Sequence, residues 1–523
     1  MAAPPDLASR LTHDGPPPST TAVATAPDRL DPEVAKYATA AHTPIGPAEN
    51  ARLKRMVDKR VLSVMVFTYF LQALDKGSMS FASLEIRNDL DLNHDQRYPW
   101  LTTCIYLAVL VVEYPTNYAL TKLPIAKYLG ISIILWGTVL ALHASARSFA
   151  VLLTLRTLLG TFEAVCQPAF LLLSSMWYKR SEQASAVTYW YMMNGMQQIV
   201  GGLLAYSFAL TPRTAPLRSW QAMFITYGGF SVLWGVFVLA WLPDSPMRAR
   251  CFSEADKAAL LARVRGNRTG VQNRVWKKEQ ALEALRDPQT WAYGLIQLCT
   301  TLPTSGLGAF ANIIISSLHF TTLQTQLLAM VLGAVIIGVL LSATALARKT
   351  NQTLLVMAAY VTPSIAGTVV LMSVRNTGLG TKAGLLVAYY AVLSFWAAQT
   401  LGMSMVGRNV GGVTKRSVAV AMNFVWWAVG NAIGPQVFLD RDKPRYFIAF
   451  ATHMGCYALL LLDIAFLRWY LNRENERKDA AQGLPPGTGA RRSEKEELED
   501  EDEDGSAFED LTDRENPRFR YVC

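Results

Sequence analysis

Charged residues are scarce in this chain. They make up 17% of its 523 residues, whereas soluble globular proteins carry about 25%. Hydrophobic residues reach 51%, and this combination argues against a soluble fold and favours a membrane protein. Lys and Arg exceed Asp and Glu by nine. The basic residues stand between long apolar runs, however, so membrane topology explains them better than nucleic-acid binding does.

The motifs of soluble enzymes are also missing. The sequence contains no GxSxG, no P-loop, no HExxH and no CxxC. Its six cysteines are scattered, and its six histidines are isolated. We therefore expect a protein that is not an enzyme and that uses neither a metal ion nor a cofactor.

What the sequence does contain is a series of apolar runs. A helix needs roughly 20 apolar residues to cross about 30 Å of hydrocarbon, and in lipid its backbone groups must be satisfied within the segment. The runs predict an all-α integral membrane protein with twelve transmembrane helices in two six-helix bundles. The expected spans are roughly 60–80, 99–120, 128–147, 149–175, 187–210, 220–242, 290–315, 323–346, 353–374, 384–407, 417–438 and 446–470.

A polar stretch divides these runs into six plus six. The leader is rich in Pro, Ala and Thr, and the tail contains a run of acidic residues, so both ends are expected to be disordered. The predicted organisation is a disordered N-terminus (1–50), an N-terminal six-helix bundle (51–242), a linker loop (243–289), a C-terminal six-helix bundle (290–470) and an acidic disordered tail (471–523).

Lys and Arg in the short loops predict the orientation. Pairs such as Lys179-Arg180, Arg348-Lys349 and Lys415-Arg416 fall on the same side as the basic linker loop. Both termini should therefore be cytoplasmic. The expected location is the plasma membrane, with a vacuolar or other internal membrane as the alternative, and the expected functional unit is a monomer.

Charged residues inside spans are costly, which makes each one a functional candidate. Arg156 and Glu163 lie seven residues apart and so share one helix face, about 10 Å apart. Arg156 is a permanent cation able to grip a carboxylate. A solute anion at Arg156 would cancel part of its field, and Glu163 would then take up a proton more easily. The alternative is a buried ion pair that only holds the helices together.

Other charges also lie within expected spans. Lys76 is a candidate for anion binding, and Asp75 is a candidate to carry or relay the proton. The alternative for both is an interhelical salt bridge. Glu113 is a candidate proton site or part of a local polar kink. Asp463 is expected to be structural.

Neutral polar residues complete the candidate site. Amides within membranes either contact the solute or join helices. Trp426 and Trp427 lie in mid-span, away from the interface that tryptophan prefers, so one of them is expected to line the cavity. The substrate-binding candidates of this kind are Gln167, Asn194, Gln198, Asn423 and Trp426.

The six-plus-six plan resembles the major facilitator superfamily, and several ordered motifs resemble its anion:cation symporter family, in the fungal allantoate-permease branch. They are Leu74-Asp-Lys-Gly77, Arg156-Thr-Leu-Leu-Gly-Thr-Phe-Glu-Ala164 with Pro168, Trp177-Tyr-Lys-Arg-Ser-Glu-Gln183, Trp241-Leu-Pro-Asp-Ser-Pro246, Arg286-Asp-Pro-Gln-Thr-Trp291, Asn409-Val-Gly-Gly-Val-Thr-Lys-Arg416, Gly430-Asn-Ala-Ile-Gly-Pro-Gln436 and Asn472-Arg-Glu-Asn-Glu-Arg-Lys478.

This resemblance implies proton-coupled symport of a small organic anion such as allantoate, ureidosuccinate, nicotinate, pantothenate, biotin or a short peptide. In related anion transporters, the residues that match Arg156 and Glu163 are associated with anion binding and proton coupling. The implied partners are protons, the solute and the lipid bilayer, with the proton gradient as the energy source and no nucleic acid.

The chain departs from this branch at positions that are expected to face the solute cavity. It reads Pro303-Thr-Ser-Gly306 where the branch usually shows Pro-Asn-Gly-Gly, and Trp426-Trp427 where the branch tends to have Gly-Tyr. The alternatives are export of a secondary metabolite or drug by proton antiport and, from another class, a membrane nutrient sensor that binds solute without moving it.

Overall fold

The computed structural model describes the chain in segments. Within them, every regular element is a helix, which confirms the predicted all-α architecture. Residues 1–45 and the acidic run 494–504, which the sequence predicts to be disordered, lie outside the described residues. Described are residues 46–92, 96–179, 182, 186, 189–210, 216–249, 251–265, 277–374, 378–443, 445–483, 511–517 and 519–523.

The N half of the fold consists of long apolar helices. Ser148 caps the N-terminus of helix α6, and its hydroxyl accepts a hydrogen bond from the backbone N–H of Val151 (3.5 Å). This serine satisfies one of the N–H groups that the first turn leaves free. The elements are α2 (Pro47–Val57), η3 (Asp58–Leu62), α3 (Ser63–Asp89), α4 (Arg97–Lys122), α5 (Ile125–Leu142), η4 (His143–Ser145), α6 (Phe149–Glu163), α7 (Cys166–Trp177), α9 (Met193–Ala209) and α10 (Ser219–Trp241).

Two linker helices lead into the C half. Helix α13 starts with Pro288 in its first turn, and the Asp287 carboxylate accepts from the N–H of Gln289 (3.3 Å). The linker helices are α11 (Glu254–Arg265) and α12 (Lys278–Arg286). The C half contains α13 (Pro288–Ser317), α14 (Thr322–Thr350), α15 (Thr353–Ser373), α16 (Leu379–Val392), η5 (Leu393–Phe395), α17 (Trp396–Asn409), α18 (Val413–Ile433), η6 (Gly434–Val437), η7 (Asp440–Asp442) and α19 (Phe447–Ala481).

Nine helical segments of the described chain are long and apolar enough to cross a membrane. The three other expected spans coincide with α3, α4 and α9. Helices α3 and α4 have 27 and 26 residues, which corresponds to about 40 Å each at 1.5 Å per residue. They are more polar because they carry Asp75, Lys76 and Glu113. The count of twelve spans stays a prediction.

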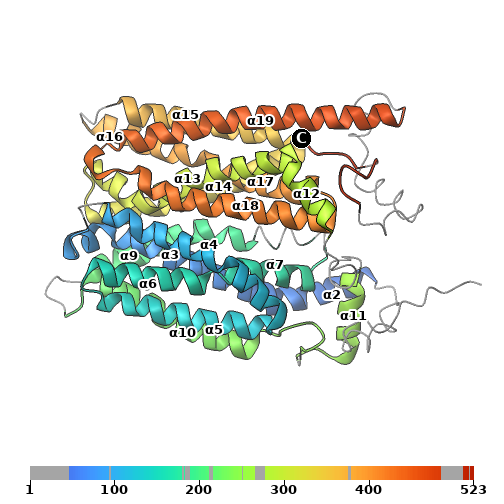
Figure 1. Cartoon of the computed structure of the whole chain (residues 1–523). Coiled ribbons are helices and arrows are strands. Elements are labelled where there is room, and N and C mark those ends of the chain that lie inside the picture. Colours follow the sequence, from blue (N-terminus) through green and yellow to red (C-terminus); the bar gives the residue numbers. More distant parts are fainter. Residues whose placement is uncertain are drawn as a thin grey trace, which may run out of the picture.

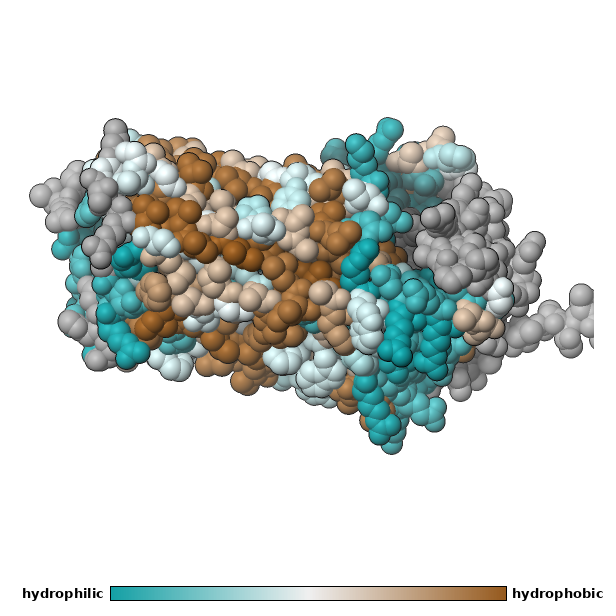
Figure 2. All heavy atoms as spheres, turned by 90° about the horizontal axis from the view of Figure 1, so that it is seen from above, coloured by the Kyte–Doolittle hydropathy of each residue, from teal (hydrophilic) through white to brown (hydrophobic). Residues whose placement is uncertain are grey.

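The two halves lie side by side with their helices along a common direction (Figure 1). In the N half α10 packs on α5 and α6 on α4, and in the C half α18 packs on α13. Hydrophobic side chains form a band around the middle of the face shown in Figure 2, and hydrophilic side chains gather at its two ends. This distribution is that of a multi-pass membrane protein.

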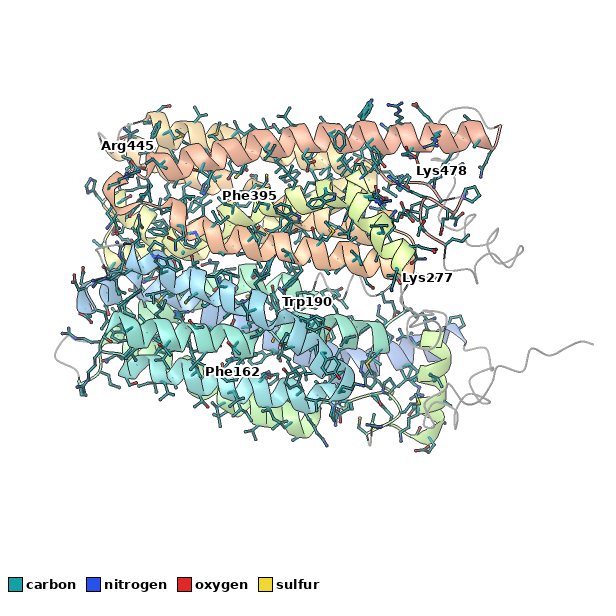
Figure 3. The ribbon with its side chains drawn as sticks, viewed as in Figure 1. Phe162, Trp190, Lys277, Phe395, Arg445 and Lys478 are labelled. Atoms are coloured by element: carbon teal, nitrogen blue, oxygen red, sulfur yellow. The ribbon has the colours of Figure 1, made fainter. Side chains whose placement is uncertain are left out.

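The two ends of the molecule differ. One, the linker end, carries α2, α11, α12 and the described residues of the C-terminus (Figure 1). Figure 3 places Lys277 and Lys478 at this end and Arg445 at the other, the opposite end. Helix α2 starts at Pro47, inside the expected disordered leader, and α19 continues to Ala481, past residue 470.

The C-terminal tail also departs from the prediction of disorder over 471–523. Residues 511–517 and 519–523 are placed, and Asp513 and Tyr521 among them are buried. The prediction rested on the acidic run, which says nothing about the residues that follow it.

Polar contacts join the two halves at the opposite end. The Tyr98 hydroxyl donates to the carbonyl of Ala309 (2.8 Å), and Arg87 pairs with Asp440 (3.5 Å). Further donors are the Thr103 hydroxyl to Ala432 O (2.7 Å), Asn312 Nδ2 to Ser80 O (3.0 Å) and Gln326 Nε2 to Phe81 O (3.1 Å). These bonds hold the halves together there.

Glycines allow α9 of the N half and α14 of the C half to touch closely. A Cβ added at Gly333 would lie 2.3 Å from the carbonyl oxygen of Gly195, and one at Gly195 would lie 3.0 Å from that of Gly333. Backbone atoms cannot yield as a flexible side chain can. Small residues are the usual means of such contact between membrane helices.

We predict that Gly333→Ala destabilises the folded protein by about 1–3 kcal/mol because the new methyl group overpacks the α9–α14 contact. Thermal unfolding in detergent measures the effect. The control is Gly338→Ala on the same helix, where an added Cβ meets nothing within 4 Å. Equal melting temperatures for the two variants would contradict the close contact.

Candidate functional site

An ion pair between α3 and α6 forms the centre of the candidate site. The Nζ of Lys76 lies 3.7 Å from Oε2 of Glu163. The Glu163 side chain is 1% exposed, whereas that of Lys76 is 29% exposed. Gln72, one turn before Lys76, donates from Nε2 to the backbone carbonyl of Glu163 (3.2 Å) and so fixes α3 to the end of α6. The cation is therefore the accessible member of the pair.

Arg156 lies on the same buried face of α6 as Glu163, as their spacing predicts. Its side chain is buried, and its guanidinium carbon lies 5.7 Å from the centroid of the Phe224 ring on α10. Within the described part of the chain, its Nε and Nη2 have no hydrogen-bond partner. Arg156 thus adds positive potential inside the N half, while Lys76 makes the ion pair with Glu163.

Asp75 is also enclosed within the N half. Its side chain is fully buried, and its Oδ2 accepts from the hydroxyl of Ser231 on α10 (3.4 Å). Its Oδ1 has no hydrogen-bond partner among the described residues. Asp75 and Lys76 point in different directions because adjacent helix positions differ by about 100°. Only Lys76 of the two is paired with Glu163.

Amides and aromatic rings extend the site along α3. The Asn194 side chain on α9 donates to the Tyr69 hydroxyl (3.2 Å), and Gln167 of α7 interacts with the same hydroxyl. Tyr69, Gln72 and Lys76 stand at i, i+3 and i+7, on one helix face. Two of the predicted amides therefore meet at a tyrosine two turns from Lys76.

The C half contributes an aromatic contact through α18. Trp427 meets Tyr106 of α4, with ring centroids 5.5 Å apart. Trp426, the predicted residue, instead packs against Trp291 of α13 (6.3 Å). Asn423, one turn earlier, is buried. The tryptophan that reaches the N half is therefore Trp427.

Gln198 faces the C half. It borders a small hollow together with Thr304 of α13 and Trp396 of α17. The Thr304 hydroxyl donates to Oε1 of Gln399 (3.1 Å), also on α17. Neutral donors and acceptors thus gather between α9, α13 and α17.

Glu113 and Asp463 lie apart from the Lys76–Glu163 pair. Glu113 Oε1 accepts from Nδ2 of Asn117 (3.0 Å) on the same helix, α4. Asp463 is buried in α19, and its Oδ2 has no partner among the described residues.

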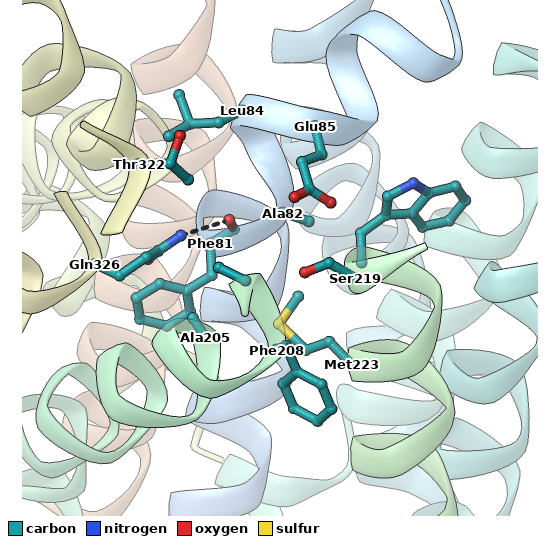
Figure 4. Close-up of a pocket in the computed structure, with 12 residues that line it drawn as sticks. Phe81, Ala82, Leu84, Glu85, Ala205, Phe208, Ser219, Met223, Thr322 and Gln326 are labelled. Carbon is teal, nitrogen blue, oxygen red and sulfur yellow. Dashed lines mark hydrogen bonds between the residues drawn. The ribbon is translucent and has the colours of Figure 1, made fainter. Parts of the chain in front are cut away.

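A second hollow lies between α3, α9, α10 and α14. Figure 4 shows Phe81, Glu85, Ser219, Met223 and Gln326 around it, contributed by α3, α10 and α14. The hydrogen bond from Gln326 to the Phe81 carbonyl crosses it. None of the predicted substrate or proton residues lines this hollow.

Sequence reasoning missed several residues of the site. Gln72 and Tyr69 could have been found, because they stand at helical spacing from Lys76. Tyr106, Thr304 and Gln399 carried no such signal, since their positions depend on how α4, α13 and α17 pack.

Comparisons with known proteins fit this architecture. The family model of the Major Facilitator Superfamily matches residues 65–435. An uncharacterized transporter of Schizosaccharomyces pombe is 33% identical over 91% of this chain and 90% of its own length. The allantoate permease of Saccharomyces cerevisiae is 29% identical over 95% and 90%, and a thiamine pathway transporter of that yeast is 31% identical over 90% and 86%.

Solved structures agree on the fold. A bacterial homologue of the human lysosomal transporter Spinster, in an inward-facing and occupied conformation, superimposes with a TM-score of 0.60 at 14% identity. The match covers 78% of this chain and 96% of that one. With the family model spanning most of the chain, we conclude that this protein belongs to the Major Facilitator Superfamily and is a transporter of the fungal permease type.

Proposed function

We propose that the protein carries a small organic anion into the cell together with a proton, by alternating access. The observation that carries this proposal is the Lys76–Glu163 pair. It places a partly exposed ammonium 3.7 Å from a buried carboxyl. The ammonium can bind a carboxylate, and the carboxyl can hold a proton.

Coupling follows from competition for Lys76. When a solute carboxylate binds the Lys76 ammonium, Glu163 loses its ion pair with Lys76. A buried carboxylate without its cation is costly, so Glu163 then accepts a proton from the aqueous side that the site faces. Linkage requires that a proton on Glu163 also favours the anion. The loaded site holds one anion, one ammonium and one neutral acid.

We assign the contact with the anion to Lys76, whereas the sequence predicted that Arg156 makes it. Arg156 is 1% exposed, so it supports the site through its field rather than by direct contact. Asp75 is also buried, and its carboxyl accepts a hydrogen bond from the hydroxyl of Ser231. Tyr69, Asn194 and Gln167 are proposed to position the remainder of the solute through neutral hydrogen bonds.

Alternating access is supported by the contacts between the halves. The Tyr98, Thr103 and Arg87 bonds to the C half lie at the opposite end. With the linker end assigned to the cytoplasm by its Lys and Arg, these bonds would close the outer side and must break when the site opens outward. We place the transporter in the plasma membrane and propose that it acts as a monomer.

The names of the relatives bear on the substrate. The matched proteins include an allantoate permease and a thiamine pathway transporter. A single accessible ammonium beside neutral amides suits a monoanion with further hydrogen-bonding groups. Allantoate, nicotinate and pantothenate are therefore the first candidates.

We predict that Lys76→Ala lowers anion uptake at least about tenfold, because loss of one partner leaves both the anion and Glu163 without their cation. Uptake of labelled allantoate, nicotinate and pantothenate at pH 5 and pH 7.5 measures this. Lys349→Ala, which removes an exposed lysine at the linker end of α14, should transport normally at equal surface expression. Normal uptake by Lys76→Ala would remove Lys76 from the site.

We predict that Arg156→Ala abolishes uptake although the protein still reaches the membrane, since Glu163 and Asp75 would lose a stabilising positive charge. Arg156→Lys, which restores the charge, should recover a measurable fraction. Surface labelling and uptake are compared for the two variants. Full activity of the alanine variant would show that this charge has no part in transport.

We predict that Glu163→Gln flattens the dependence of uptake on pH while exchange of internal for external anion is partly retained, because the amide mimics the protonated acid. Glu113→Gln is the matched comparison and should keep the pH dependence of the wild type. Counterflow and net uptake across pH 5–8 distinguish the two. An unchanged profile for Glu163→Gln would move the coupling site elsewhere.

A further inference from the structure

The described residues of the C-terminus are anchored at the linker end of the C half. Asp513 is fully buried, and its Oδ1 lies 2.7 Å from Nζ of Lys415. The same carboxylate accepts from the N–H of Gly411 (3.1 Å), from Nε2 of Gln289 (3.0 Å) and from the hydroxyl of Tyr521 (2.7 Å). One carboxyl group of the tail therefore meets α13, the turn before α18 and the tail itself.

Lys415 is the centre of this contact. Its side chain is fully buried and also pairs with Glu283 of α12 (2.8 Å) and with Asp287 (2.7 Å). Arg514 adds a second cation to Asp287 (3.2 Å). Three carboxylates converge here and face two cations, the ammonium of Lys415 and the guanidinium of Arg514. Removal of one partner from a buried ion pair leaves an uncompensated charge and is strongly destabilising.

Reciprocal backbone bonds hold the rest of the tail. Asn475 of α19 donates to and accepts from the backbone of Tyr521 (both 2.9 Å). Asn409 does the same with Val522 (2.9 and 2.8 Å). Lys478 donates to the carbonyls of Asp513, Asn516 and Phe519, and Thr353 N–H donates to that of Cys523 (2.8 Å).

These contacts reach the connection between the halves. Oε1 of Gln280, on α12, accepts from the N–H of Thr414 (3.1 Å), and Glu283 of the same helix pairs with Lys415. Helix α12 is the last part of the linker, and the tail completes the charge cluster that holds it against α18. Loss of Asp513 would leave Lys415 with two carboxylates and open one side of the cluster.

We propose that residues 511–517 and 519–523 form a C-terminal latch, which binds through Asp513 to the Lys415 cluster and fastens linker helix α12 to the C half. The occupant of this site is the chain's own C-terminus. The latch is separate from the Lys76–Glu163 pair, so its test does not depend on the proposed transport mechanism.

Cys523 reports the state of the latch. Its Sγ interacts with Oδ1 of Asn472 (3.1 Å), and burial raises the pKa of its thiol. Because the thiolate is the reactive form, the docked cysteine should be alkylated slowly. Cys251 is exposed in the same chain and serves as the internal reference.

The test alkylates the full-length protein in detergent with a polar maleimide and follows each cysteine by mass spectrometry. We predict that Asp513→Asn raises the rate at Cys523 relative to Cys251 at least about fivefold, because the tail undocks. Glu515→Gln removes the same charge from an exposed side chain that bonds within the tail. It should leave the ratio within about twofold of the wild type.

Hydrogen exchange in the same variants tests the link to α12. The backbone amides of residues 278–286 should exchange faster in Asp513→Asn than in the wild type. In Glu515→Gln they should exchange at the wild-type rate. Equal Cys523 and Cys251 rates in the wild type, or a Cys523 rate unaffected by Asp513→Asn, would overturn the latch. Unchanged exchange of α12 in a variant with a freed Cys523 would overturn its role in holding the linker.

Discussion

Glu163 is buried within an apolar helix bundle and is paired with the ammonium of Lys76, 3.7 Å away. In a membrane interior, a carboxylate without a cation has a high free energy, and the neutral acid is the more stable state. In the proposed mechanism, an anion that engages Lys76 therefore alters the protonation of Glu163. The proposed coupling of solute to proton needs no large movement of either side chain, only a change of partner.

The rest of the N half sets the conditions for this exchange. Gln72 ties α3 to the end of α6 through its hydrogen bond to the Glu163 carbonyl, one turn before Lys76. Arg156, which is buried, supplies a positive field that the solvent does not screen. The C half approaches through Trp427 and through the glycine contact of α9 with α14. In the proposed alternating access, movement of the halves changes which side of the membrane reaches the pair.

The sequence predicted the features that depend on local pattern. Apolar runs identified most helices, and a seven-residue spacing placed Arg156 and Glu163 on one buried face. It could not predict which cation Glu163 would pair with, because that depends on how α3 crosses α6. The choice between Trp426 and Trp427 likewise depended on the rotation of α18. The docking of the tail was not predicted, because the composition of the acidic run before it indicates disorder. Docking depends on a partner that is distant in the sequence, such as Lys415.

The most direct measurement is proton uptake on anion binding by the purified protein in weakly buffered solution. A pH indicator reports protons, and calorimetry reports bound anion. The account predicts that about one proton is taken up per anion bound by the wild type, and none by Glu163→Gln. Binding of the anion by the wild type without a change in bound protons would contradict it.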